Sequence, residues 1–221
     1  MIPLRDIIPS RTTPIVTIPL IVVNVLVFLY ELTLGQAVND FTLYFGLVPA
    51  AFSWVAVLTS MFLHGGLFHV AGNMLYLWIF GDNVEDRMGH GRFLVFYLLC
   101  GTAAALAQTI TAPDSVVPMV GASGAIAGVM GAYFVLYPKS RIVTLVPLFF
   151  FFQIIEVPAI FFLGIWIALQ ALDGTISITT PATGGGVAFF AHIGGFAFGI
   201  LTVRLVKKRD PLQPVSRYRW R

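Results

Sequence analysis

Three polar residues lie in apolar stretches of this chain, and their side chains together could carry out acyl transfer. Ser123 could attack a carbonyl carbon, His192 could take the serine proton, and Asn73 could donate a hydrogen bond to the resulting oxyanion. Polar groups within lipid-facing segments cost free energy and therefore mark candidate functional positions. A serine or an asparagine alone more often has a packing role, so the hypothesis depends on the combination.

The serine and the histidine each precede a pair of glycines spaced four residues apart. These pairs are Gly124 with Gly128, and Gly195 with Gly199. Such spacing leaves one helix face bare and allows two membrane helices to approach closely, although packing alone is its commonest use. Ser123 is also expected at a helix start, where free backbone N–H groups favour negative charge. The pattern predicts that Ser123 and His192 lie within reach of each other.

The composition indicates that lipid surrounds the elements carrying these residues. The 221 residues are 58% hydrophobic and 10% charged, with a mean hydropathy of +0.90. Soluble domains carry about 25% charged residues. The net charge of +3 does not indicate nucleic-acid binding, because the basic clusters lack interleaved aromatic residues, and we expect no nucleic-acid partner. The single cysteine, Cys100, excludes an intramolecular disulfide and a cysteine-rich metal site.

Six apolar runs are long enough to cross a bilayer as helices. They cover residues 14–34, 66–81, 93–110, 121–137, 155–172 and 187–206. We therefore predict an all-α fold, a polytopic bundle of six transmembrane helices. Pro147 and Pro158 interrupt the apolar run 142–154, which we interpret as an interfacial or re-entrant connection, with a seventh span as the alternative.

The distribution of charge supports six spans and gives their orientation. With six spans, all 13 Lys and Arg residues fall on one side, here called the basic side, and none in the outer loops 35–65, 111–120 and 173–186. The positive-inside rule then makes both termini cytoplasmic. We expect a cytoplasmic segment 1–13, a membrane domain 14–206 and a basic tail 207–221 that contacts lipid head groups. The expected location is the cell (plasma) membrane.

The three candidate residues have similar predicted depths. The second, fourth and sixth spans all run from the outer side to the basic side. At 1.5 Å per residue, Asn73, Ser123 and His192 lie roughly 3–11 Å from the outer boundary. The candidate site is therefore expected near the outer face.

Three separated motifs resemble those of the rhomboid intramembrane serine proteases. They are Gly121-Ala-Ser123-Gly124, His69-Val-Ala-Gly-Asn73 and Ala191-His192-Ile-Gly-Gly195, and the likeness covers roughly residues 14–206. The resemblance implies that Ser123 is the nucleophile and His192 the general base of a dyad without an acidic third member. It also implies that Asn73, His69 and the Ser123 amide stabilise the oxyanion, and that the Gly121 backbone shapes the substrate cleft.

The resemblance further implies single-span membrane protein substrates, a lipid bilayer around the protein, and neither cofactor nor metal; the oligomeric state stays undetermined. No carboxylate pair occurs at depth and no His-Glu-x-x-His pattern is present, which argues against aspartyl and zinc intramembrane proteases. Two other functions remain alternatives. One is a catalytically silent relative that binds membrane clients, and the other is a transporter that uses His69, Asn73 and His192 as a polar path.

Two positions depart from the family pattern. Many rhomboids have arginine after the tryptophan of the first outer loop, whereas Val55 follows Trp54 here. Many also have a tyrosine under the histidine, four residues after the nucleophile, where this chain has Ala127. Another group must then orient His192, or its ring is held less tightly.

Overall fold

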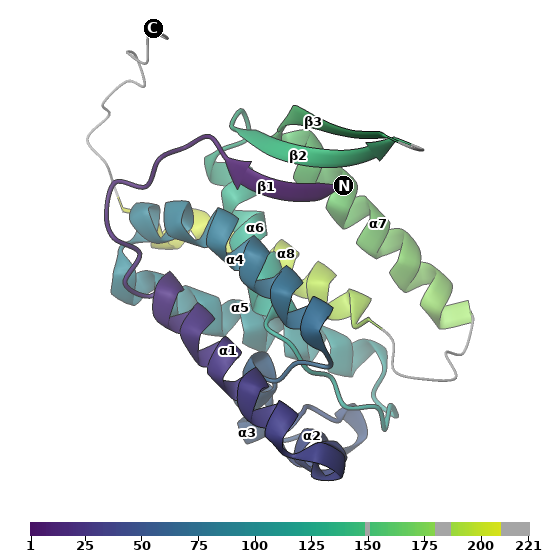
Figure 1. Ribbon diagram of the computed structural model, residues 1–221. Helices are drawn as coiled ribbons and strands as arrows, with labels where there is room; N and C mark the ends of the chain where they lie inside the picture. Colours follow the sequence, from purple (N-terminus) through teal and green to yellow (C-terminus); the bar gives the residue numbers. More distant parts are fainter. Residues whose placement is uncertain (149–150, 180–186, 209–221) are drawn as a thin grey trace, which may run out of the picture.

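The computed structural model describes residues 1–148, 151–179 and 187–208. Six long helices form a bundle, and a small sheet lies across one end of it (Figure 1). The helices are α1 (Thr17–Thr33), α4 (Leu67–Met88), α5 (His90–Thr111), α6 (Ser123–Leu136), α7 (Ala159–Thr179) and α8 (Phe189–Val206). We call the end with the sheet the basic end, and the end where α4, α6 and α8 begin the outer end.

The six helices lie where the six apolar runs were predicted, but the number of spans stays a prediction. Within the described residues, three helices are long and apolar enough to cross a membrane alone, namely α5, α7 and α8. A fourth span arises if α4 is joined to the preceding segment Trp54–Phe62, from which it is bent by 90°. The apolar helices α1 and α6 are shorter. The structure therefore shows a mainly helical membrane protein, and the positions of its termini relative to the membrane remain expectations.

Helix α6 lies at the centre of the bundle and is almost completely buried from Gly124 to Tyr133. Its glycines face those of α8 so closely that a methyl group at Gly195 would lie 2.0 Å from the Gly124 carbonyl oxygen. A methyl group at Gly199 would lie at the same distance from the Gly128 carbonyl oxygen. No real side chain fits at these distances. The predicted approach of the two glycine faces is thus observed.

The prediction of an all-α fold is wrong for the apolar run 142–154. This segment forms a hairpin of β2 (Arg141–Leu148) and β3 (Phe151–Pro158), and β1 (Ile2–Asp6) completes an antiparallel sheet of order β1-β2-β3. The hairpin is rich in β-branched residues, which favour strands, and its two prolines cannot continue a helix. A strand pair satisfies the backbone hydrogen bonds that a broken helix would leave open.

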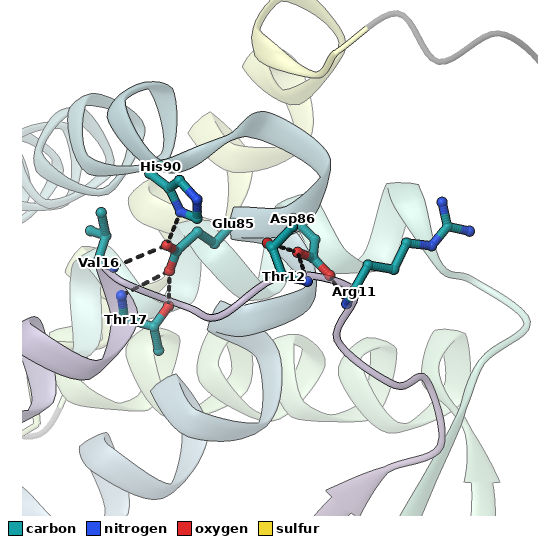
Figure 2. A network of polar contacts seen from close by, with 7 residues as sticks. All are labelled: Arg11, Thr12, Val16, Thr17, Glu85, Asp86 and His90. Atoms are coloured by element: carbon teal, nitrogen blue, oxygen red, sulfur yellow. Dashed lines mark hydrogen bonds and ion pairs between the residues drawn. The ribbon is translucent and has the colours of Figure 1, made fainter.

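At the basic end, α4 holds the chain that precedes α1. The buried carboxylate of Glu85 accepts hydrogen bonds from the backbone N–H of Val16 (3.0 Å) and Thr17 (2.8 Å) and from the Thr17 hydroxyl (2.7 Å). Its other contact is with His90 Nδ1, at 2.6 Å (Figure 2). These bonds fix the start of α1 against the end of α4.

The neighbouring Asp86 accepts hydrogen bonds from residues that precede those held by Glu85. It accepts from the backbone N–H groups of Arg11 (2.6 Å) and Thr12 (3.0 Å), and also from the Thr12 hydroxyl (Figure 2). Helix α4 continues to Met88 before Gly89, at φ +82°, turns the chain into α5. Residues 209–221, most of the predicted basic tail, lie outside the described residues.

Short helices form the predicted outer loop 35–65. They are η1 (Gly35–Ala37), α2 (Val38–Phe45), η2 (Pro49–Ala51), α3 (Trp54–Thr59) and η3 (Ser60–Phe62). Tyr44, Trp54 and Val55 are each more than 60% exposed. Such exposed apolar side chains suit contact with lipid, which remains a prediction for this loop.

Candidate active site

Ser123 and His192 meet at the outer end of the α6–α8 contact. Ser123 is the first residue of α6 and His192 lies in the first turn of α8. The serine Oγ is 2.8 Å from His192 Nε2, and the histidine is 8% exposed. Because the glycine faces bring the helix axes close, two short side chains can form this hydrogen bond. The hydroxyl donates when Nε2 carries no proton, as a general base requires.

A third side chain contacts the other ring nitrogen of His192. Gln170 Oε1, from α7, lies 2.6 Å from His192 Nδ1. The Trp166 ring, one turn earlier on α7, lies beside the imidazole with ring centroids 5.7 Å apart and an interplanar angle of 38°. Neither Gln170 nor Trp166 is among the site residues predicted from the sequence. A glutamine within an apolar helix was the available signal, but sequence alone does not show which way it points.

His69 and Asn73, one turn apart on α4, converge on Gly121 just before the nucleophile. Gly121 has φ +122°, which disfavours any residue with a side chain. A methyl group there would lie 2.7 Å from His69 Nε2 and 3.5 Å from Asn73 Nδ2. Both nitrogens therefore face the backbone that leads into Ser123.

The hydrogen-bond partners indicate which of these nitrogens can donate. The Gly65 backbone N–H donates to His69 Nδ1 at 3.4 Å, so a neutral His69 carries its proton on Nε2, toward Gly121. Asn73 Nδ2 is buried and has no hydrogen-bond partner among the described residues. Two free donors thus lie beside the start of α6, whose first backbone N–H groups have no partner within the helix. This arrangement suits an oxyanion next to Ser123.

His64 lies on the outer side of His69, with ring centroids 5.2 Å apart. Its ring nitrogens have no partner among the described residues, and its backbone N–H points to the Glu31 carboxylate at 3.2–3.3 Å. A cleft of about 410 Å³ opens beside His64 and Gly65 and is bordered by Asn39 and Thr42 of α2. Neither the dyad nor His69 lines this cleft.

Among the described residues, no three His, Cys, Asp or Glu side chains are grouped to hold a metal ion. The buried Cys100 packs against α6, where a methyl group on Gly128 would lie 2.3 Å from its sulfur. Cys100 thus helps to set the distance between α5 and α6.

The chain is similar to known proteins over most of its length. A family model described as "Rhomboid domain" matches residues 51–209, well over half of the chain. The chain belongs to the rhomboid family. The match includes all residues of the candidate site, from His64, which lies just before α4, to His192 on α8.

Several relatives carry rhomboid names. Rhomboid protease GluP of Bacillus subtilis is 38% identical over 109 residues, 48% of this chain and 21% of the relative. The human presenilin-associated rhomboid-like protein, mitochondrial, is 32% identical over 167 residues, 71% of this chain and 40% of the relative. Rhomboid protein 1, mitochondrial, of Saccharomyces cerevisiae is 31% identical over 153 residues, 67% and 41% of the two chains. The chain thus matches well under half of the length of each relative. The family match and the apolar helices identify a membrane protein of the rhomboid family.

The expected location in the cell (plasma) membrane is wrong by this comparison. The human and yeast relatives both have "mitochondrial" in their names, and so does the bovine protein, 31% identical over 167 residues. These relatives are named as mitochondrial proteins, which contradicts the expected location. Loop charges reveal which side of a membrane a loop occupies, but not which membrane it is.

Proposed function

We propose that this rhomboid is an intramembrane serine endopeptidase that cleaves transmembrane or membrane-adjacent segments of single-span membrane proteins. The observation that carries the proposal is the 2.8 Å contact between Ser123 Oγ and His192 Nε2, beside free donors on α4. A serine that only packed in a helix would bond to its own backbone. Here the hydroxyl meets an imidazole from a different helix.

In the proposed reaction, Ser123 Oγ attacks the peptide carbonyl while His192 Nε2 takes its proton. The tetrahedral oxyanion receives hydrogen bonds from Asn73 Nδ2, His69 Nε2 and the Ser123 N–H. The imidazolium then protonates the leaving amine, and the C–N bond breaks to leave an acyl-serine. Water attacks the ester carbonyl while His192 takes one of its protons. The bond between the carbonyl carbon and Ser123 Oγ then breaks, the imidazolium returns the proton to Oγ, and the carboxylic acid leaves.

The proposed substrate reaches the dyad laterally between α4 and α7. Helix α7 packs mainly against α8 and exposes Phe161, Ile165 and Leu169 on its other side. A substrate helix must unwind locally near its outer end, because its carbonyls are otherwise held in i→i+4 hydrogen bonds. Substrates with helix-breaking or small residues near the cleaved bond should therefore be favoured.

The test is cleavage of a single-span reporter by the purified protein in liposomes. Ser123→Ala and His192→Ala should each lower kcat/KM by more than about 10³-fold. Ser177→Ala is the matched control, since the Ser177 hydroxyl bonds to the Gly174 carbonyl of its own helix (2.7 Å), and it should retain the wild-type rate. Full activity in either dyad variant would refute the assignment.

A fluorophosphonate probe distinguishes the protease from the catalytically silent alternative. An activated serine should react covalently with the probe, and labelling should disappear in Ser123→Ala and in His192→Ala. An unlabelled wild-type protein that still captures membrane proteins would favour the client-binding function.

A further inference from the structure

We propose that Gln170 is a positioning residue for His192, and that it makes the general base dependent on the docking of α7. The proposal rests on the proposed protease function and deepens it. The contact that carries it is the 2.6 Å distance between Gln170 Oε1 and His192 Nδ1. Together with the Ser123 contact, it forms a continuous hydrogen-bond chain across α6, α8 and α7.

The amide oxygen of Gln170 determines which nitrogen of the His192 imidazole carries the proton. A neutral imidazole carries one proton, and a carbonyl oxygen can only accept a hydrogen bond. The proton therefore lies on Nδ1 and is donated to Gln170, which leaves the Nε2 lone pair directed at the serine hydroxyl. The opposite tautomer would place a lone pair against the amide oxygen and an N–H against the serine.

The burial of His192 makes this partner necessary. The residue is only 8% exposed, so an Nδ1–H without a partner would destabilise the folded protein. Trp166, which lies on α7 one turn before Gln170, packs against the His192 ring. The two α7 side chains thus fix both the tilt and the tautomer of the imidazole. Ala127, a completely buried residue, has no side chain that could do so from α6.

A neutral acceptor also suits this depth in the membrane. A carboxylate in the same place would stabilise the imidazolium, but a buried charge in a lipid-embedded site is costly. The amide orients the ring without adding a charge. It provides the orienting role of a third catalytic member while the site stays free of an acid.

The location of Gln170 on α7 links the base to substrate access. Helix α7 borders the proposed lateral opening and is held mainly by its packing on α8. If α7 moves away, His192 loses both its hydrogen-bond acceptor and its ring contact. The base is then oriented only while α7 is docked, so opening for substrate and activation of the serine occur in sequence.

The experiment compares Gln170→Leu with Gln170→Glu in liposomes, measuring kcat, KM and the pH profile for one reporter. Leucine has a similar size but no acceptor, and it should lower kcat on the order of 10²-fold while KM changes less than about threefold. Glutamate keeps the acceptor. It should retain kcat within about tenfold of wild type and move the acid limb of the kcat/KM profile to higher pH, because its charge stabilises the imidazolium.

The matched control is Gln108→Leu on α5. The Gln108 side-chain oxygen accepts from the Ala191 backbone N–H at 3.3 Å, so it supports the start of α8 next to His192 without touching the ring. This variant should stay within about threefold of the wild-type kcat. An equal loss of kcat in Gln108→Leu and Gln170→Leu would show that Gln170 only supports packing and would overturn the proposal.

Ser123→Ala separates this proposal from the proposed function. An active wild type with an inactive Ser123→Ala establishes the protease, and a Gln170→Leu variant with near-normal kcat then refutes the positioning role alone. If Gln170→Leu does not fold, the Gln170→Glu profile decides. An acid limb that coincides with the wild-type limb would overturn the proposal.

Discussion

Two polar clusters occupy opposite ends of α4 and differ in how far their hydrogen bonds are satisfied. At the basic end, the carboxylates of Glu85 and Asp86, which we call the anchor, accept hydrogen bonds from backbone N–H groups and hydroxyls. Glu85 also contacts the His90 imidazole. At the outer end, about 18 Å along the same helix, Asn73 Nδ2 is buried without a partner among the described residues. His64 has two such ring nitrogens.

The difference shows how one helix can serve stability at one end and chemistry at the other. A buried polar group normally gains its stabilising effect from a partner, and an unpaired donor costs about 1–3 kcal/mol. The anchor therefore contributes to folding. The outer cluster gives up part of that stability, and its donors remain available for charge that develops in a transition state. Mutations at the two ends should accordingly affect different measurements.

The largest difference between the effect on activity and the effect on stability is expected from Asn73→Ala. Loss of an oxyanion donor should lower kcat about 10²- to 10³-fold, because the missing hydrogen bond forms only in the transition state. The free energy of unfolding in detergent should not fall and should rise by about 1 kcal/mol, because the variant removes a buried donor, Asn73 Nδ2, that has no partner among the described residues. A folding defect that accounts for the lost activity would place Asn73 with the anchor instead.

Glu85→Ala should show the reverse pattern, with a slightly smaller effect. Removing the carboxylate leaves the buried N–H and hydroxyl of Thr17, and the partly buried groups of Val16 and His90, without this partner, so the free energy of unfolding should fall by about 3 kcal/mol. Cleavage per folded molecule should stay within about twofold of wild type. The comparison is Glu156→Ala, which removes an exposed ion pair with Arg141 (3.2 Å) and should cost less than about 1 kcal/mol.

The smallest effect is expected from Asp6, which joins β1 to the bundle at the basic end. It accepts hydrogen bonds from the Tyr133 hydroxyl (2.7 Å) and Asn83 Nδ2 (2.9 Å). Burial is the main cause that raises the pKa of Asp6 to about 6; the Tyr133 hydrogen bond opposes the rise, and the nearby Asp82 adds a smaller increase that is already part of that value. Because the folded pKa exceeds the unfolded value of 3.8, the folded protein binds more protons between these values.

Asp6 should therefore contribute stability below pH 4 that is lost as the pH rises through about 6. Asparagine resembles the protonated carboxyl group, so in Asp6→Asn the melting temperature should depend less on pH between pH 4 and pH 7 than it does in the wild type. Asp40→Asn, which changes an exposed carboxylate of α2, should show the same dependence of melting temperature on pH as the wild type. An unchanged slope in Asp6→Asn would show that another group causes the pH dependence.

The sequence by itself indicated that lipid surrounds this protein and that Ser123 and His192 lie close together. A composition with so few charges is compatible only with lipid around most of the surface. Glycines spaced four apart after Ser123 and His192 specify which helix faces can touch, because that spacing is set by the helix repeat. Both features depend on composition or on neighbours within one turn, which a sequence displays directly.

Only the tertiary structure decided the sheet and the partner of His192. The hairpin 141–158 gains its third strand from Ile2–Asp6, and nothing in either segment alone indicates that pairing. Gln170 lies 22 residues before His192, on a helix whose rotation is set by its packing against α8. Strand register and helix rotation arise from contacts between distant segments, so a pattern read along one chain does not contain them.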